Sequence, residues 1–338
     1  MAVKIEEKDG VMIYRRPSRK GPRDLWRAWQ VLRRRYLLRI RLMTRRLGAG
    51  YVFCRPQGGW NDTLVQVSLC LDYALRHRRR LIIDTSRSGL LDVLARYFRP
   101  ASTFRGIAFS VPEGFADHSR SMSCLPASLT GRGVRYESEY REETNYVEAL
   151  SRQRLTFDMN RHHVEQLLVH EQCGGGGDSR RFFDWAVPTK EVRTEIEKSL
   201  RKLPLAYFAV HIRHTDRKTK YKEFLAAVQP LVAGKNILVC TDSFEVLTYA
   251  RETFGASRTF SVAEIPDSRG QSLHHNPGLT DWRVNVGALC DLAAMSGAEA
   301  ILRPSASLGF QSGFVDLANS LMNRQLRWRW EIPKPATT

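Results

Sequence analysis

Short apolar segments alternate with helical segments along most of the chain, and this alternation limits the folds that it can adopt. Segments rich in β-branched and aromatic residues lie at 51–55, 80–85, 207–213, 236–242, 258–263 and 300–303. Helical segments fit between them, at 63–78, 89–98, 189–203, 221–232, 243–254, 282–296 and 310–319. Strands that alternate with helices build parallel sheets covered by helices. The sequence therefore predicts an α/β fold.

The length of the chain predicts two domains. Its 338 residues exceed what one hydrophobic core usually supports, and 43% of them are hydrophobic, which is enough to fill real cores. The clearest helix follows Thr189, which can cap it, and carries the apolar stripe Val192, Ile196, Leu200 and Leu203. We expect this helix to open the second domain. The expected division is a basic segment at 1–47, α/β domains at 48–185 and 186–325, and a tail at 326–338.

The positive charge of the chain is concentrated in one segment. The formal net charge is +18, and residues 15–46 contribute +12 of it, with 13 Lys and Arg against Asp24 alone. Apolar residues recur every three or four positions within 24–47, which predicts an amphipathic helix capped by Asp24. Such a helix suits an anionic membrane surface, and it equally suits docking on the protein's own body with solvated arginines. A broad nucleic-acid-binding face should extend beyond one helix, so we expect no nucleic-acid partner.

The rest of the composition indicates a reduced, cytoplasmic protein. No stretch of about 18 apolar residues is present, and charged residues occupy the N-terminus where a signal peptide has its apolar region. The six cysteines, at positions 54, 70, 124, 173, 240 and 290, show no CxxC or zinc-like spacing. We expect them to be reduced and mostly buried. The predicted location is the cytoplasm, with the basic helix as a means of contact with the inner face of the membrane.

Polar residues follow three of the predicted strands, at the point where each strand ends. YFAVHIRHTDRKTKY (207–221) passes from an apolar strand into histidines, cations and an aspartate. NILVCTDS (236–243) ends on Asp242 and on Ser243, a candidate cap for the next helix. AEAILRPSASLGF (298–310) leads into a turn with Ser305 and Ser307 before a helix. Doubly wound sheets bind ligands beyond the carboxyl ends of their strands, and helix N-termini hold phosphate oxygens. Together these stretches predict a nucleotide-diphosphate pocket.

Each stretch has a purely structural interpretation when it is taken alone. His211 fits a satisfied core histidine, Asp242 and Ser305 fit helix caps, and the cations at 217–220 fit a solvated face. Their common position at strand ends favours a binding site over these separate explanations.

Four blocks of the sequence resemble one enzyme family. They are RPQGGWNDTLVQVSLCLDYALRHRRRLIIDTSRSGLLD (55–92), AVHIRHTDRK (209–218), LVCTDSFEVL (238–247) and CDLAAMSGAEAILRPSASLGF (290–310). They resemble the glycine loop, the HxR motif and two later motifs of the fucosyltransferases related to the bacterial nodulation enzyme and the animal core α1,6-fucosyltransferase. The resemblance implies a GT-B-like fold with two Rossmann-like domains and a cleft between them. It also implies GDP-fucose as the donor substrate, with no metal and no other cofactor.

The resemblance assigns donor-binding roles to residues of three blocks. Arg213 occupies the arginine that binds the GDP pyrophosphate in the family, and His211 is the histidine two positions earlier. Asp242 and Asp291 fall on acidic positions that contact the nucleotide, and Ser307 falls on the serine of the third motif. A fixed guanidinium beside helix N-termini can stabilise a departing diphosphate in place of Mg²⁺, which is the role we expect for Arg213.

The catalytic base is marked less clearly than the donor site. The animal enzyme's proposed catalytic glutamate corresponds to Tyr221 in this chain. An attacking hydroxyl needs a carboxylate or imidazole within hydrogen-bond reach, and the candidates are Asp216, His214 and Glu223, in that order. His214 stands where the animal enzyme has a second arginine and the nodulation enzyme has a histidine.

The glycine loop GGWND is the candidate on the acceptor side. Its residues Gly58, Gly59, Asn61 and Asp62 either hold the acceptor or close over the donor, and a tight structural turn is the competing interpretation. Asn61 replaces a glycine of the family, which is tolerable because asparagine also adopts left-handed backbone conformations.

These features predict an inverting, metal-independent glycosyltransferase that moves fucose from GDP-fucose to a glycan or lipid-linked glycan. No HxE, DxD or cysteine cluster near the predicted strand ends supplies metal ligands. One alternative is an enzyme that uses another nucleotide sugar. The other is a non-catalytic protein that binds membranes or nucleic acid through its basic segment and keeps an α/β scaffold, and the narrow distribution of charge counts against it.

Overall fold

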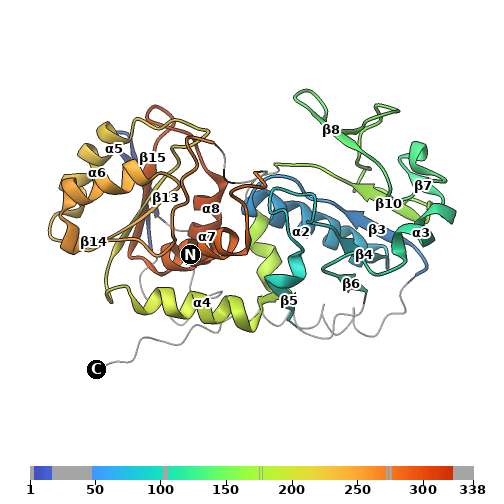
Figure 1. Ribbon diagram of the computed structural model, residues 1–338, viewed down its shortest axis with the longest axis horizontal. Coiled ribbons are helices and arrows are strands. Elements are labelled where there is room, and N and C mark those ends of the chain that lie inside the picture. The colour runs from blue at the N-terminus through green and yellow to red at the C-terminus, as the bar shows by residue number, and fades with distance from the viewer. Residues whose placement is uncertain are drawn as a thin grey trace. The chain divides into compact units, whose positions relative to one another are not determined.

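A computed structural model describes residues 4–16, 48–101, 106–174, 176, 178–271, 273 and 276–322 (Figure 1). The predicted basic helix at 24–47 and the tail at 326–338 lie outside these residues. The chain divides into two compact units. We call Gln30–Val187 the middle unit, and Met1–Trp29 together with Pro188–Thr338 the terminal unit.

The terminal unit is built on a six-stranded sheet with the order β1-β2-β15-β12-β13-β14. Its strands are β1 (Lys4–Lys8), β2 (Val11–Arg15), β12 (Phe208–Ile212), β13 (Ile237–Thr241), β14 (Thr259–Phe260) and β15 (Ala300–Pro304). Strands β12 to β15 run parallel to one another, whereas β2 pairs antiparallel with both β1 and β15. The parallel part agrees with the strands predicted from the sequence.

Helices cover both faces of this sheet. They are α4 (Lys190–Arg201), α5 (Tyr221–Val228), α6 (Phe244–Phe254), α7 (Trp282–Gly297) and α8 (Gly313–Met322), with short 3-10 turns at Gln229–Val232 and Ala256–Arg258. One face of the sheet packs Val210 and Val239 against Phe224 of α5 and Val246 of α6. Figure 1 shows α5 and α6 on one side of strands β13 and β15, and α7 and α8 on the other. The arrangement is a doubly wound α/β sheet.

Two of these helices begin on the caps that the sequence predicts. The side chain of Thr189 accepts a hydrogen bond from the amide of Val192, and that of Ser243 accepts one from the amide of Val246. A capping hydroxyl satisfies one of the amides that the first helical turn leaves without a partner. Helix α8 begins at Gly313, a little later than the predicted start at 310.

The N-terminal hairpin, formed by β1 and β2, is a structural element that the sequence analysis did not predict. The sequence indicates one basic segment at 1–47, whereas residues 4–15 belong to the sheet of the terminal unit. Asp9 and Gly10 have φ values of 50° and 77°, as a two-residue hairpin turn of the Asp-Gly type requires. Val11 and Ile13 are buried in the same core as the parallel strands. The hairpin is held by that burial as well as by its ladder with β15.

The middle unit has a second parallel sheet, with the order β6-β4-β3-β10-β7. Its strands are β3 (Tyr51–Cys54), β4 (Arg80–Ile83), β6 (Ile107–Ala108), β7 (Cys124–Leu125) and β10 (Leu167–His170). The other elements are α2 (Trp60–Arg76), α3 (Phe115–His118), 3-10 turns at Leu94–Arg96, Ser119–Ser121, Ala127–Leu129 and Asp178–Asp184, and two short pairs, β5 (Phe98–Pro100) with β11 (Ala186–Pro188) and β8 (Ser138–Arg141) with β9 (Asn145–Glu148). Strand β3 is central: β4 and β6 lie on one side of it in the sheet, and β10 and β7 lie on the other.

The helix predicted at 89–98 is wrong. Only Leu94–Arg96 forms a 3-10 turn there, and β5 follows directly. The carboxylate of Asp92 accepts hydrogen bonds from the amide of Val93 and the hydroxyl of Tyr97, and the carbonyl of Asp92 accepts one from Thr85. Side-chain bonds of this kind compete with the helical ladder.

The cysteines agree with the sequence-based expectation. All six are free, five of them are buried, and Cys173 is half-buried. Within the residues that the structure describes, no helix is long and apolar enough to cross a membrane.

Candidate functional site

The three polar stretches predicted from the sequence meet at one edge of the terminal sheet. Strands β12, β13 and β15 are adjacent and parallel, so their carboxyl ends lie side by side. His211 is in register with Cys240 of β13, which brings the segment after β12 next to the segment after β13. The following turns supply the side chains of the candidate donor site.

Arg213 is held at this edge by a bidentate ion pair. Its Nε and Nη2 atoms donate to the two carboxylate oxygens of Asp216 at 2.8 and 2.6 Å. The side chains of Arg213 and Asp216 are 25% and 29% exposed, so solvent reaches both. The ring of Phe310 contacts two guanidinium groups, with its centroid 5.7 Å from Arg213 and 5.1 Å from Arg217. An aromatic face stacked on guanidinium groups restrains their orientation.

Asp242 connects the segment after β13 to the segment after β12. One of its oxygens accepts a hydrogen bond from the amide of His214 at 2.7 Å, and the other accepts one from the hydroxyl of Thr215 at 2.6 Å. Both bonds go to a charged acceptor, which makes them stronger than ordinary neutral bonds. The carboxylate therefore fixes the loop that carries Arg213.

The three candidate bases differ in their surroundings. The Nδ1 atom of His214 accepts a hydrogen bond from the amide of Thr219 at 3.2 Å, so the neutral ring carries its proton on Nε2 and offers no free acceptor there. Glu223 lies exposed on the first turn of α5 and makes no hydrogen bond or ion pair with the described part of the chain. Asp216 lies directly beside Arg213 at the strand-end edge.

Tyr221 stands at the position of the animal enzyme's proposed catalytic glutamate, but its hydroxyl cannot serve as a carboxylate base. Its hydroxyl donates to Glu245 at 2.5 Å, and this bond is the main cause that raises the pKa of Tyr221 to about 12. The hydroxyl stays protonated at neutral pH. The ring of His214 packs edge-on against the ring of Tyr221, with the centroids 4.8 Å apart.

The serine-rich turn follows β15 and folds against the loop after β12. The hydroxyls of Ser305 and Ser307 lie 2.8 Å apart, and the carbonyl of Ser305 accepts bonds from the amides of Leu308 and Gly309. Ser305 is buried, whereas Ser307 is exposed. The amide of Lys220 donates to the carbonyl of Leu308 at 2.9 Å, which joins this turn to the loop that carries Arg213.

His211 on β12 is half-buried and packs toward α8, and Asp291 is a buried residue of α7. The ring of His211 contacts Phe314, with centroids 5.9 Å apart, and burial lowers its pKa to about 4, so the ring is neutral. Burial raises the pKa of Asp291 from its ordinary value of 3.8 to about 7, against the opposing effect of hydrogen bonds from the Cys240 thiol and the Ala263 backbone. Among the described residues, Oδ1 of Asp291 has no hydrogen-bond partner. A buried acceptor without a partner is costly, which makes this oxygen a candidate ligand contact.

The glycine loop lies in the middle unit, between β3 and α2. Gly58 has a φ of 93°, and a Cβ atom there would lie 2.7 Å from Oδ2 of Asp62, so glycine is required at this position. Gly59 caps α2 with an extended backbone, and nothing lies within 4 Å of a Cβ atom added to it.

Asn61 lies inside α2, so its place in the chain does not draw on the left-handed conformations that asparagine tolerates. Its side chain accepts a hydrogen bond from Ser179 at 2.7 Å and donates to the carbonyl of Gly176 at 3.5 Å. Asn61 therefore ties the start of α2 to the segment that follows β10.

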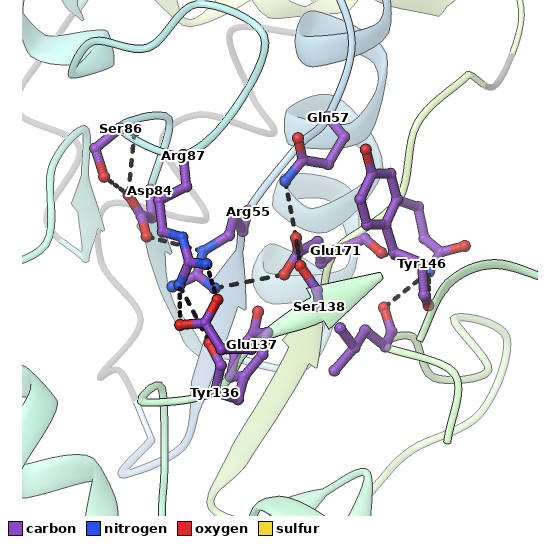
Figure 2. Close-up of polar contacts among 12 residues, drawn as sticks. Arg55, Gln57, Asp84, Ser86, Arg87, Tyr136, Glu137, Ser138, Tyr146 and Glu171 are labelled. Carbon is purple, nitrogen blue, oxygen red and sulfur yellow. Dashed lines mark hydrogen bonds and ion pairs between the residues drawn. The ribbon is translucent and has the colours of Figure 1, made fainter. Parts of the chain in front are cut away.

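A buried polar cluster at the carboxyl edge of the middle sheet was missed by the sequence analysis (Figure 2). Arg55 follows β3, Asp84 follows β4 and Glu171 follows β10. Arg55 donates from Nε to Asp84 at 3.0 Å and from Nη1 to Glu171 at 3.5 Å. Glu171 also accepts bonds from Gln57 at 2.8 Å and Ser138 at 2.5 Å. The signal was available, because each of the three charged residues directly follows an apolar segment.

Aromatic rings complete the surroundings of Arg55. Its guanidinium carbon lies 4.5 Å from the ring centroid of Tyr136 and 5.3 Å from that of Phe53. The nearby carboxylates help to raise the pKa of Arg55, and the group stays charged.

Within the described residues, no group of three or more His, Cys, Asp and Glu lies close enough together to hold a metal ion.

Comparisons with known proteins identify the fold. No protein-family model matches the sequence, and no curated protein matches it at a significant level. Among solved structures, NodZ α-1,6-fucosyltransferase co-crystallised with GDP shares 18% identity at a TM-score of 0.54, over 80% of this chain and 92% of that one. The same enzyme soaked with GDP-fucose gives 17% and 0.55, over 81% and 92%. Fucosyltransferase NodZ from Bradyrhizobium gives 17% and 0.51, over 74% and 86%. The expected α/β, GT-B-like fold is confirmed: this chain has the fold of the NodZ fucosyltransferases.

Proposed function

We propose that this chain is a glycosyltransferase that moves fucose from GDP-fucose to a glycan or lipid-linked glycan. One observation carries the proposal. Arg213, Asp242 and the Ser305–Ser307 turn, each placed at a strand end, are joined by hydrogen bonds at one edge of a sheet in the NodZ fold. NodZ structures of that fold were obtained with GDP and with GDP-fucose.

Arg213 supplies the charge that the reaction needs. When the sugar leaves, negative charge develops on the diphosphate, and a bidentate guanidinium beside backbone amides stabilises it. Because the Arg213–Asp216 pair is partly exposed, exchanging the carboxylate for a phosphate costs little desolvation. The hydroxyls and amides of the serine-rich turn complete the phosphate contacts. The site thereby acts without a metal ion.

Asp216 is the base of the proposed mechanism. Donor binding removes Arg213 from its carboxylate, which then accepts the proton of the acceptor hydroxyl as that oxygen attacks the anomeric carbon from the side opposite the diphosphate. The bond to the diphosphate breaks as the new glycosidic bond forms, so the configuration of the sugar is inverted. His214 is less suited because Nδ1, the acceptor nitrogen of its neutral ring, already accepts a hydrogen bond from the amide of Thr219.

Asp291 accounts for the choice of base in the nucleotide. Its buried Oδ1 atom lacks a partner among the described residues, and guanine presents two adjacent N–H donors to a carboxylate. Uracil presents one such donor. A carboxylate at this position therefore favours GDP over UDP.

Calorimetry with a panel of GDP, UDP, CMP and dTDP tests the donor. We expect GDP to bind more tightly than the other three, and EDTA to leave both binding and transfer unchanged. Preference for another nucleotide would support the alternative of a different sugar donor. No binding of any nucleotide would contradict the enzyme assignment and favour a non-catalytic protein. Strict dependence on Mg²⁺ or Mn²⁺ would contradict the metal-independent mechanism.

We also propose that residues 24–47 hold the enzyme at the anionic inner face of the cytoplasmic membrane. This rests on the sequence, in which the cations of residues 15–46 are each worth roughly 1 kcal/mol near such a surface. Removing residues 1–47 would also remove the hairpin at 4–15, so replacing Arg33, Arg34 and Arg35 by glutamine is the better test. The variant should detach from anionic liposomes at lower salt than the parent protein. Equal attachment of both would contradict the membrane role.

A further inference from the structure

The N-terminal hairpin touches the serine-rich turn of the proposed donor site. Strand β2 pairs with β15 up to Val11 and Pro304, which places the hairpin turn at the carboxyl edge of the sheet. There the carbonyl of Gly10 accepts a hydrogen bond from the amide of Ser305 at 2.8 Å. The first residues of the chain thus meet a turn that lies almost three hundred residues later.

Gly10 and Leu308 fit together without room for a side chain at position 10. Gly10 has a φ of 77°, and a Cβ atom added to it would lie 2.6 Å from Cδ1 and 3.1 Å from Cγ of Leu308. Such contacts are closer than carbon atoms tolerate, so an added methyl group must displace Leu308 or the hairpin.

Leu308 connects this contact to both parts of the candidate donor site. Its amide donates to the carbonyl of Ser305, and its carbonyl accepts from the amide of Lys220, in the loop that carries Arg213. Gly309 is equally confined, since a Cβ atom there would lie 2.8 Å from Oγ1 of Thr219. Because both bonds are made by the Leu308 backbone, a displacement of the hairpin that reaches this backbone would move both the serine-rich turn and the arginine loop.

The hairpin also holds the two ends of the segment that contains the turn. The guanidinium carbon of Arg303 lies 5.1 Å from the ring centroid of Tyr14 on β2. Nη1 of Arg303 donates to the carbonyl of Ser312 at 3.3 Å and contacts Asp316 of α8 at 3.3 Å. Arg303 is buried and directly precedes Pro304. Tyr14 thus packs on the group that ties the end of β15 to the start of α8.

We propose that the hairpin is a positioning element of the donor site, with Gly10 as its positioning residue. The proposal rests on the function proposed above, because it assumes that the serine-rich turn binds the donor diphosphate. Gly10 touches no reacting atom and acts by fixing Ser305 and Leu308. Binding sites lose affinity when their groups are misplaced by a fraction of an ångström to one ångström, even if nothing else changes.

The test compares Gly10→Ala with Gly234→Ala, a matched control in the same unit. Gly234 has a φ of 70°, and nothing lies within 4 Å of an added Cβ atom. Both substitutions strain a left-handed backbone and should lower the thermal midpoint, Gly10→Ala by more because its methyl group also meets Leu308. Only Gly10→Ala should weaken GDP binding, by about tenfold, and raise the donor KM with the acceptor KM unchanged. Adding Leu308→Ala should restore part of the lost affinity, because it removes the atoms that the new methyl group meets.

Hydrogen exchange separates the two ways in which the proposal can fail. The Ser305 amide should exchange faster in Gly10→Ala than in the parent protein or in Gly234→Ala. If the parent binds GDP and Gly10→Ala binds it equally well, or if both alanine variants weaken it equally, the positioning role is overturned and the proposed function stands. If the parent does not bind GDP, the donor assignment fails and the positioning role fails with it, whereas the exchange data still decide whether the hairpin holds the turn.

Discussion

The carboxyl edges of the two sheets carry the same kinds of residue in different surroundings. In the middle unit the side chains of Arg55, Asp84 and Glu171 are 5%, 8% and 0% exposed. In the terminal unit the side chains of Arg213 and Asp216 are 25% and 29% exposed. Both arginines directly follow a parallel strand, and both pair with a carboxylate.

Burial decides whether a strand-end arginine can exchange its carboxylate partner for a ligand. Arg55 needs two carboxylates and two aromatic rings to remain charged inside the protein, and exchanging any of them for a ligand would require opening the core. Arg213 pairs with Asp216 and stacks on Phe310, and solvent reaches all three side chains, so a phosphate can replace the carboxylate. We interpret the first edge as structural and the second as the binding edge.

Replacing Arg55 by alanine should have the largest effect on stability. It would leave Asp84 and Glu171 buried without their cation, and breaking a buried pair in this way costs about 3–5 kcal/mol. We expect a loss of this size in the free energy of unfolding, measured with urea.

The matched control is Arg87→Ala, beside this cluster. Arg87 pairs with Glu137, their side chains are 44% and 74% exposed, and Arg87 also donates to the carbonyl of Tyr136 at 3.2 Å, so its loss should cost only about 1 kcal/mol. Equal losses for the two variants would break the distinction between a sealed and an open edge.

Replacing Arg213 by alanine should have the opposite signature. Transfer should fall by about a hundredfold or more, since the guanidinium stabilises charge that develops on the diphosphate, while the urea midpoint should hardly change. Arg217→Ala is the control, because Arg217 stacks on the same ring of Phe310. If both variants lose activity equally, the stack rather than the Arg213 charge is responsible. Full turnover by Arg213→Ala would reject the donor site.

The fold of the terminal unit was largely predictable because its signals are local. Strands β12 and β13 are continuous apolar runs, and α4 and α6 begin on the hydroxyl caps Thr189 and Ser243. Because these strands are parallel, the polar residues that follow them must lie at the same edge of the sheet. The hairpin escaped prediction although Asp9-Gly10 is a turn signal. Four of the five residues of β1 (KIEEK) are charged, so the strand shows no apolar alternation, and the segment after β2 is strongly basic.

The middle unit was harder to predict because long-range pairing decides it. Strands β6 and β7 have two residues each, which is too short for any periodicity to show. The pair between Arg55 and Glu171 joins positions 116 residues apart, and nothing in the sequence near either one indicates the other. Burial of a charged residue can be predicted only once its partners are known.

Asp291 is a second buried carboxylate, and among the described residues it lacks the arginine, glutamine and serine partners of Glu171. Its pKa is raised to about 7, so between about pH 4 and 7 the folded protein keeps a proton that the unfolded chain has lost. Stability from this group is therefore present at low pH and is lost as the pH rises through about 7. Asp291→Asn removes that loss and should be more stable than the parent by about 4 kcal/mol at about pH 8, with little difference at about pH 4.

The same variant should bind GDP more weakly, because asparagine offers one acceptor where the carboxylate offers two. GDP affinity of the parent should rise with pH as Asp291 ionises. Calorimetry and urea unfolding at both pH values measure the two effects. If Asp291→Asn gains no stability at the higher pH, the carboxylate has a partner that removes its cost, and its proposed role in base recognition loses its support.

Substitutions of two serines, one at each edge, should have the smallest effects and should distinguish the structural edge from the binding edge. Ser138 donates to the buried Glu171, whereas the exposed Ser307 lies against Ser305 in the open turn. One such hydrogen bond contributes about 1 kcal/mol, so Ser138→Ala should lower the free energy of unfolding by about that amount and leave the donor KM unchanged. Ser307→Ala should leave unfolding unchanged and raise the donor KM by about fivefold. If Ser307→Ala changes only the acceptor KM, the turn lies on the acceptor side of the site, and the second edge would be a binding edge for a different substrate.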